Sequence, residues 1–208
     1  MKREIFGKGA KKTGITPSIA LINPKFSRNL SQAVRACSCF GIEQCWFTGN
    51  RVQLELADKK RLPREERMKG YSAVDIIHYD YLFDQFKGAV PVGIELVEGA
   101  ESLTIFEHPE NALYIFGPED GSIPKLARAF CHRFVFIPMK HCSNLAAAVY
   151  ITLYDRYLKR EWSGLETEKT TSDVLAEPRG WQQFENKYYG PIDKNFKDVT
   201  VKDMLEDK

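Results

Sequence analysis

The sequence is poor in cysteine, and its cysteines follow no regular spacing. Five cysteines occur among 208 residues, and no two of them form a Cys-x-x-Cys pair. An odd number of irregularly spaced cysteines argues against a disulfide framework and against a zinc site built on paired thiolates. The composition therefore predicts reduced thiols in a cytoplasmic protein that holds no metal.

The sequence also lacks a strong net charge, a long apolar run and a dinucleotide-binding motif. The formal net charge is only +2, so any affinity for nucleic acid must come from a local basic patch. No apolar run is long enough to span a bilayer and no signal-like stretch opens the sequence, so no membrane association is expected. The absence of Gly-x-Gly-x-x-Gly between a first strand and helix disfavours a nucleotide-binding oxidoreductase.

Apolar runs of strand length are what the sequence does contain. In residues 112–158, two such runs are joined through a short helix-like segment, and a polar turn then leads into an alanine-rich helix. This pattern is typical of buried parallel strands, with polar residues at the strand ends where open α/β sheets bind ligands. Similar runs occupy residues 17–23, 44–48, 74–79 and 90–97. Together they predict an α/β fold with a mostly parallel sheet and helices on both faces.

A helix is predicted from residue 27 to residue 40, with Ser27 as its N-cap and Gly41 as the residue that ends it. An apolar stripe at helical spacing predicts its buried face, and Arg28, Gln32 and Arg35 fall on a different face. The residues of this apolar stripe are Leu30, Ala33, Val34 and Cys37. A second short helix is expected over residues 81–87.

The chain divides into a basic amino-terminal arm over residues 1–16, a central domain over 17–160 and a carboxyl-terminal extension over 161–208. The arm, which includes Lys11 and Lys12, is either a solvated segment or a contact for phosphate groups. The polar segment 49–69 predicts a surface loop and helix. The extension is rich in aromatic residues, which favours packing on the domain or across a dimer over stacking on RNA.

Three motifs occur in an order and at separations that resemble the SpoU/TrmH branch of the SPOUT family. The first is Asn29-Leu-Ser-Gln-Ala-Val-Arg35 followed by Phe-Gly, the second is Phe-Gly117-Pro-Glu119-Asp-Gly, and the third is Ile-Pro-Met followed by Asn144-Leu. The resemblance covers residues 18–159. It implies a deep carboxyl-terminal trefoil knot, a homodimer with active sites that use both subunits, and methyl transfer from S-adenosyl-L-methionine to a ribose 2′-hydroxyl of structured RNA, with tRNA favoured over rRNA.

The resemblance also implies a role for particular residues. Arg35 matches the family's essential arginine. Because arginine stays protonated and is a poor general base, we expect it to act as a donor fork that holds a phosphate and orients the hydroxyl. Asn29 and Asn144 are expected to orient Arg35 and the ribose. Glu119 either pairs with an arginine or accepts backbone N–H bonds.

The implied cofactor site lies at the strand ends. Gly117 is expected there because only glycine lets the backbone come close to a ligand. Arg28, Arg35, Lys11 and Lys12 are expected to contact RNA. The positions that match cofactor-binding residues are Glu95, Leu96, Gly117, Ile137, Met139, Cys142 and Leu145.

Two departures from the family pattern keep an alternative open. The loop between Met139 and Asn144 is shorter than usual by roughly three residues, and Cys142-Ser143-Asn144 replaces the usual Ser-Leu-Asn. In addition, Ala146 stands where the family often has a serine. Since this loop normally wraps the cofactor, the alternative is a knotted RNA-binding module without catalytic activity.

Overall fold

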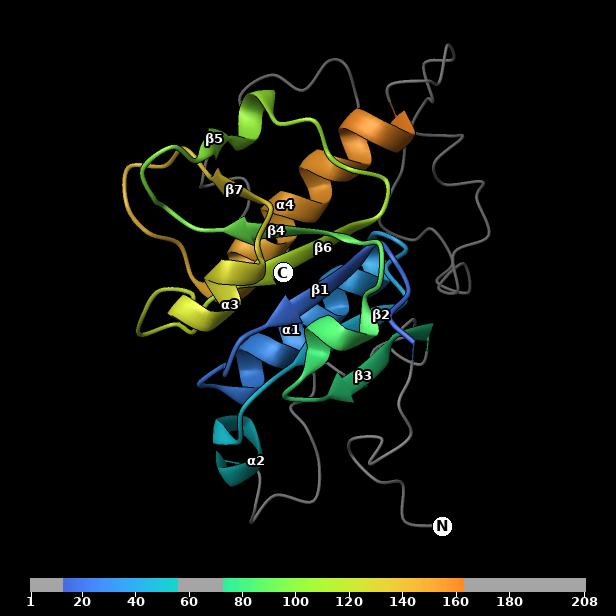
Figure 1. Ribbon diagram of the computed structural model, residues 1–208, viewed down its shortest axis with the longest axis vertical. Coiled ribbons are helices and arrows are strands. Elements are labelled where there is room, and N and C mark those ends of the chain that lie inside the picture. Colours follow the sequence, from blue (N-terminus) through green and yellow to red (C-terminus); the bar gives the residue numbers. More distant parts are fainter. Residues whose placement is uncertain (1–12, 56–72, 163–208) are drawn as a thin grey trace, which may run out of the picture. The chain divides into compact units, whose positions relative to one another are not determined.

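A parallel β-sheet forms the centre of the chain (Figure 1). The computed structural model describes residues 13–55 and 73–162. In these ranges seven strands follow the order β3-β2-β1-β6-β4-β7-β5, and every pairing is parallel. The predicted α/β class is therefore confirmed. The strands are β1 (Ser18–Leu21), β2 (Gln44–Phe47), β3 (Asp75–His78), β4 (Val90–Ile94), β5 (Glu101–Ser102), β6 (Ala112–Phe116) and β7 (Arg133–Phe136).

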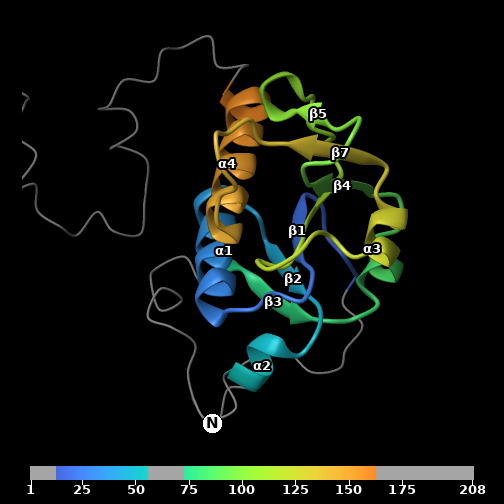
Figure 2. The same ribbon diagram turned by 90° about the vertical axis from the view of Figure 1, so that its left-hand side faces the viewer.

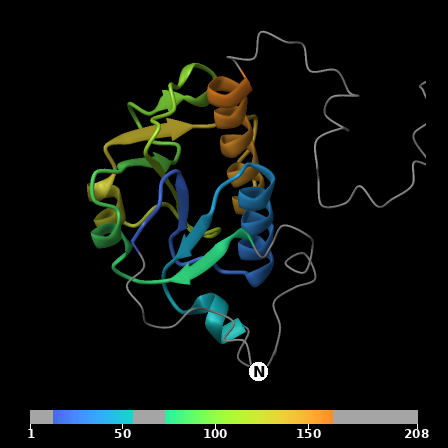
Figure 3. The ribbon, with the colours of Figure 1, turned by 90° about the vertical axis from the view of Figure 1, so that its right-hand side faces the viewer.

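Helices cover both faces of the sheet, as the apolar runs predict. Helices α1 (Ser27–Cys39) and α4 (Leu145–Tyr157) pack on one face, while α3 (Lys125–Phe130) and the 3₁₀ helix η3 (Leu82–Gln85) lie on the other (Figures 2 and 3). The other helices of the described ranges are α2 (Arg51–Glu55), the 3₁₀ helix η4 (Leu103–Ile105) and the π-helix η5 (Leu158–Trp162).

The two faces of β1 show how the strand sequence specifies two cores. Successive side chains of a strand point to opposite faces. Ile19 and Leu21 pack with α1 and α4, whereas Ala20 and Ile22 pack in the core under η3 and α3. All four are buried, which is why this strand reads as a continuous apolar run rather than an alternating one.

Helices α1 and α4 lie side by side with their amino-terminal ends at the same edge of the sheet. At that end, the side chain of Asn144 donates a hydrogen bond to Asn29. At the other end, Phe40 contacts three tyrosines of α4, with ring centroids 6.1–6.4 Å apart. These tyrosines are Tyr150, Tyr154 and Tyr157. The predicted apolar stripe of α1 is buried between this helix and the sheet, as expected.

Local details differ from the sequence expectations at helix ends. Ser27 is the first residue of α1 and not its N-cap; Phe26 takes that position and offers no side-chain cap. The helix ends as predicted, because Gly41 adopts a positive φ of 69° just beyond it. Over residues 81–87 the expected helix is only the single 3₁₀ turn η3.

Parts of the expectations lie outside the described residues. These include Lys11 and Lys12, residues 56–69 of the polar segment and residues 163–208 of the extension. None of the helices in the described ranges is both long and apolar enough to cross a bilayer. The trefoil knot stays a prediction.

Candidate functional site

The candidate site lies at the carboxyl edge of the sheet, where four neighbouring strands end. Because β1, β6, β4 and β7 are adjacent and parallel, the residues that follow them emerge at one edge. Glu119 follows β6, Glu95 follows β4 and Ile137 follows β7. The sequence expectation that these distant turns meet is consistent with this topology.

The carboxylate of Glu119 caps the amino-terminal end of α1. It accepts hydrogen bonds from the backbone N–H of Lys25 at 2.6 Å and of Phe26 at 3.3 Å, and from the side-chain amide of Asn29 at 2.6 Å. A negative group is favourable here because the helix dipole places partial positive charge at this end. Glu119 therefore anchors, from a distant turn, the two residues before α1 and the Asn29 side chain in its first turn, whereas the N-cap Phe26 offers no side-chain cap.

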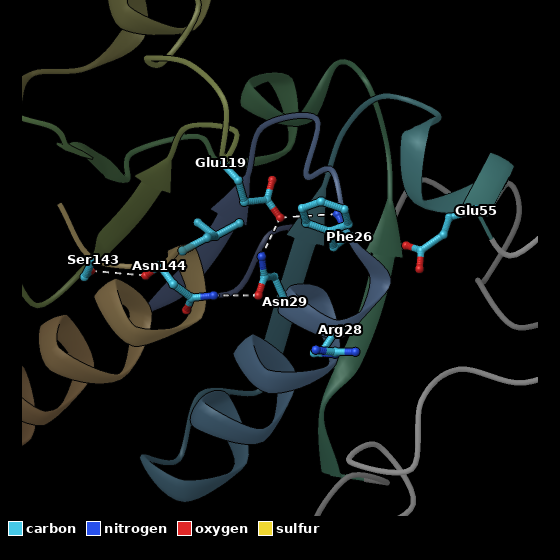
Figure 4. A pocket seen from close by; sticks show the side chains of 8 residues that line it. Phe26, Arg28, Asn29, Glu55, Glu119, Ser143 and Asn144 are labelled. Carbon is cyan, nitrogen blue, oxygen red and sulfur yellow. Dashed lines mark hydrogen bonds between the residues drawn. The ribbon is translucent and has the colours of Figure 1, made fainter.

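Asn29 links this cap to α4. Its Oδ1 accepts a hydrogen bond from Nδ2 of Asn144 at 2.8 Å, and Oδ1 of Asn144 in turn accepts from the backbone N–H of Ala147 at 2.9 Å. Asn29 is only 7% exposed, so a lost partner would be costly. Three of the four predicted catalytic residues thus form one continuous chain of hydrogen bonds, Glu119–Asn29–Asn144 (Figure 4).

A pocket of about 520 Å³ opens beside this chain of hydrogen bonds. Its lining comes from α1, α2, the Gly117–Asp120 turn and the start of α4. Arg28, predicted to contact RNA, is exposed in this lining and is the one cation among the described residues that form it. The lining residues are Phe26, Arg28, Asn29, Glu55, Glu119, Ser143, Asn144 and Leu145.

Sequence reasoning missed Phe26, Glu55 and Ser143 as parts of this pocket. Glu55 lies on α2, and its carboxylate accepts hydrogen bonds from the backbone N–H of Ser27 at 2.5 Å and from the Ser27 hydroxyl at 3.1 Å. A glutamate in a charge-rich segment carries no sequence signal for such a contact. A second carboxylate thus occupies the start of α1.

The residue after Glu119 braces the neighbouring elements. Asp120 forms a two-pronged pair with Arg51 of α2, at 2.9 and 2.7 Å, and lies 3.3 Å from Nζ of Lys25. The Arg51 guanidinium holds the pKa of the Asp120 carboxyl well below its ordinary value. These contacts tie the turn after β6 to α2 and to the segment before α1.

Arg35 does not join the Glu119–Asn29–Asn144 chain. It lies six residues beyond Asn29 on α1, about 9 Å further along the helix axis, and it is not among the pocket-lining residues. Its positive charge acts instead on Tyr150 of α4, whose pKa is raised by burial against the opposing effect of Arg35. The expectation that Asn29 and Asn144 orient Arg35 therefore has no counterpart within the described part of one chain.

The predicted cofactor residues at the strand ends differ in their solvent exposure and in whether they already have hydrogen-bond partners. Leu96 is 75% exposed and Met139 is 42% exposed, an unusual state for large apolar side chains. The Glu95 carboxylate already accepts the backbone N–H of Ile123 at 2.7 Å. Of the others, Cys142 is exposed, Ile137 is partly buried and Leu145 is buried.

The arrangement of the three motifs agrees with a sequence comparison. The profile of the SpoU rRNA Methylase family matches residues 17–154 of the 208. The chain belongs to the SpoU family. No curated protein matches its sequence.

Solved structures of SpoU and TrmH proteins share the fold. The complex of the SpoU methyltransferase AviRb from Streptomyces viridochromogenes with AdoMet is 19% identical, with a TM-score of 0.57, over 69% of this chain and 57% of that chain. The A. aeolicus TrmH/SpoU tRNA modifying enzyme is 17% identical, with a TM-score of 0.60, over 74% of this chain and 80% of that chain. A structure that concerns the 2-OH methylation of C/U34 on tRNA is 24% identical, with a TM-score of 0.57, over 68% of this chain and 94% of that chain. The present chain thus spans little more than half of the AviRb chain, and the likeness at these identities is one of fold.

Gly117, in the second SpoU motif, lies close to another backbone segment of its own chain. A Cβ at this position would lie 2.8 Å from the backbone nitrogen of Ile123 and 3.0 Å from the carbonyl carbon of Ser122. The glycine thus lets two backbone segments of the chain approach closely, and its expected contact with a cofactor stays a prediction. Its close neighbour is the segment that Glu95 also holds.

We expect Gly117→Ala to destabilise the fold by about 1–3 kcal/mol, because two backbone segments cannot yield as a side chain can. Gly121→Ala is the matched control in the same turn, since the nearest atom to its Cβ would be Cγ of Pro118 at 3.8 Å. Urea unfolding of both variants measures the difference. Equal stabilities would show that the close approach at Gly117 is readily relieved.

In residues 13–55 and 73–162, no cluster of three or more His, Cys, Asp or Glu side chains is placed to hold an ion.

Proposed function

We propose that the chain transfers a methyl group from S-adenosyl-L-methionine to a ribose 2′-hydroxyl of a structured RNA, with tRNA preferred over rRNA. The observation that carries the proposal is the hydrogen-bonded chain Glu119–Asn29–Asn144, which joins residues of three family motifs beside a pocket. Membership of the SpoU family gives the reaction class. Similar structures are described for both tRNA and rRNA, but this chain covers 94% and 80% of the two tRNA-related chains and only 56% of the rRNA methyltransferase, which favours tRNA as substrate.

The pocket has the features of a site for a sugar-phosphate. Two helices, α1 and α4, begin at its wall, and helix amino termini favour anions. Arg28 adds an exposed guanidinium that can hold a phosphate through two parallel hydrogen bonds. Because Glu119 and Glu55 already accept N–H groups at the start of α1, we assign phosphate binding to Arg28 and to the α4 end.

The exposed side chains Leu96 and Met139 fit the cofactor. They offer apolar surface at the ends of the strands β4 and β7, which are neighbours in the sheet, as the adenine ring of S-adenosylmethionine requires. When bound, this group supplies a methyl on a sulfonium, which needs no acid or base on the donor side. The role of the protein is then to hold the acceptor hydroxyl in line at near-attack distance.

Arg35 is proposed to act in a homodimer. Since it is absent from the pocket of its own chain, we assign its guanidinium to the pocket of a second subunit, where it grips the phosphate next to the target ribose and orients the hydroxyl. Ile151 and Tyr154 of α4 and Leu158 at the start of η5 are exposed, and the Tyr154 ring contacts Phe40. This is an apolar surface suited to a subunit contact. Analytical ultracentrifugation at micromolar concentration tests this; a monomer contradicts it.

The domain limits and the remaining RNA contacts stay part of the proposal. The central domain over residues 17–160 agrees with the extent of the family match. The arm with Lys11 and Lys12 is assigned to RNA phosphates, and the extension over residues 161–208 to packing on the domain or its dimer.

The second candidate function is an RNA-binding module of the same fold without catalysis. The short loop from Met139 to Asn144 and the alanine at position 146 favour it, because both reduce the groups available to wrap a cofactor. Calorimetry with S-adenosylmethionine separates the two functions. Micromolar binding supports the enzyme, and the lack of measurable binding supports the module.

We expect Met139→Ser to weaken S-adenosylmethionine binding by roughly 10-fold, because it removes exposed apolar surface worth about 1–2 kcal/mol when covered. Leu126→Ser is the matched control. Leu126 is also apolar and exposed, but it lies on α3, on the face of the sheet opposite α1 and α4. The same titration measures both. Equal loss in the two variants would contradict the assignment of Met139.

A further inference from the structure

A buried polar cluster holds the carboxyl-terminal half of α4, far from the pocket. It centres on His108, in the segment between η4 and β6, whose side chain is fully buried. Nδ1 of His108 lies 2.7 Å from the hydroxyl of Tyr114 in β6, and Nε2 lies 2.8 Å from Oδ2 of Asp155 in α4. The cluster therefore connects the central strand of the sheet to the helix that begins at Asn144.

The partners determine which ring nitrogen carries the proton. An ionised carboxylate only accepts, so Nε2 of His108 donates to Asp155. In the neutral ring Nδ1 must then accept, and the hydroxyl of Tyr114 donates to it. The Tyr114 oxygen accepts in turn from Arg156 at 3.2 Å. The hydrogen bonds thus run in one direction, Arg156 to Tyr114 to His108 to Asp155.

The charges around His108 favour its neutral form. Arg156 is only 5% exposed, and its hydrogen bonds go to neutral oxygens, namely the Tyr114 hydroxyl and the carbonyls of Pro109 and Glu110. This cation stands next to the imidazole, and none of its hydrogen-bond partners in residues 13–55 and 73–162 is a carboxylate. The charged and titratable groups that face His108 are Asp155 and Arg156 of α4, Lys159 and Arg160 of η5 and Tyr114 of β6.

Protonation of His108 would reverse the cluster. Nδ1 would become a donor aimed at the Tyr114 oxygen, which already accepts from Arg156, and the Tyr114 proton would lose its acceptor. Only the Asp155 contact would improve. Burial, together with the charges of Arg156 and Lys159, accordingly lowers the pKa of His108 below its ordinary value of 6.5, against the opposing effect of Asp155.

The other end of α4 carries Asn144. The helix has 13 residues, so it extends about 20 Å from the cluster to the pocket. Its first turn is held by two hydrogen bonds at Asn144, one to Asn29 and one from Ala147. Because α4 runs without a break from Asn144 to the His108 cluster, the two ends of the helix are mechanically connected.

We propose that His108 is a proton-sensitive latch on α4: in its neutral form it fixes the helix against the sheet, and on protonation it releases the helix and loosens Asn144 at the pocket. The latch goes beyond the proposed methyl transfer, and its test needs no substrate or cofactor.

The latch also predicts how stability depends on pH. Because the folded chain holds the His108 pKa below that of the unfolded chain, the unfolded state binds the proton first on acidification. The contribution of His108 to stability is thus complete above about pH 6.5 and is lost as the pH falls towards the folded pKa.

The latch can be tested by NMR on the full chain. The imidazole ¹⁵N signals give the tautomer and pKa of His108, and the backbone amide of Ala147, bonded to Asn144, reports on the pocket. We expect an Nε2–H tautomer at neutral pH, a pKa below 6.5 and an Ala147 signal that changes with the same midpoint. The proposal is overturned by an Nδ1–H tautomer, by a pKa of 6.5 or above, or by an Ala147 signal that shows no change at the pH midpoint of His108.

Two variants that keep the packing move the midpoint in opposite directions. Tyr114→Phe removes the donor to Nδ1 and raises the midpoint, whereas Asp155→Asn keeps an acceptor but removes its charge and lowers it, each on the order of one pH unit. His78→Gln is the control, because His78 binds Gln53 and Gly49 and lies on the edge strand β3, three positions from β6 in the sheet. An Ala147 midpoint that stays constant in Tyr114→Phe and Asp155→Asn, or that moves equally in His78→Gln, overturns the latch.

Discussion

Replacing Arg35 with alanine is expected to abolish methyl transfer, a loss of at least about 10³-fold, while S-adenosylmethionine binding stays nearly intact. The reason is that the guanidinium is proposed to hold the phosphate beside the reacting ribose, whereas no cofactor-binding position involves it. Single-turnover methylation of RNA and calorimetry with the cofactor measure the two effects separately.

The control for this prediction is Arg28→Ala, which removes a cation from the pocket itself. It should weaken RNA binding with a smaller effect on the rate at saturating RNA. In a mixed dimer of Arg35→Ala and Asn29→Ala subunits, one active site regains both residues if Arg35 serves the partner's pocket. Full turnover by Arg35→Ala contradicts the donor role, and a mixed dimer without activity contradicts the shared site.

Replacing Glu119 with alanine is expected to destabilise the fold by ~2 kcal/mol and to reduce methyl transfer by about 100-fold. Its carboxylate caps α1 by accepting three N–H groups, those of Lys25, Phe26 and the Asn29 side chain. Without it, the partly buried Asn29 loses the partner that orients its amide towards Asn144. Denaturant unfolding and the methylation rate test the two parts.

Glu119→Gln is the matched variant for the cap. It keeps the shape but exchanges one accepting oxygen for an NH₂ group that faces N–H donors, so a large part of both losses should remain. Asp120→Ala tests the neighbouring position, whose pairs with Arg51 and Lys25 are exposed and contribute little. Equal losses at positions 119 and 120 would contradict a specific role for the Glu119 cap.

The sequence predicts the sheet and the hydrogen-bonded centre of the site better than its rim. The strands β1 and β6 are continuous apolar runs, and the motifs around Asn29, Glu119 and Asn144 indicate three residues that do meet. Glu55 and Phe26 line the pocket through contacts that only the fold creates. Such contacts leave no periodicity or spacing to detect.

Two further features show where sequence reasoning fails in physical terms. The turn at Gly117 indicates a ligand site, but nothing in the sequence indicates that the glycine also lies against the backbone of Ile123. The His108 cluster joins a lone histidine to a tyrosine in an apolar strand and to Asp155, 47 residues further on. These residues become partners because the fold buries them together, and their spacing in the sequence does not predict that.

The most direct test of the central claim is to map 2′-O-methylation in the RNA of the host with and without this chain, and with the Arg35→Ala variant in its place. The account predicts at least one ribose methyl group, in tRNA, that disappears in both the deletion and the variant. An unchanged set of ribose methyl groups, or a lost methyl group that belongs to a base, would contradict it.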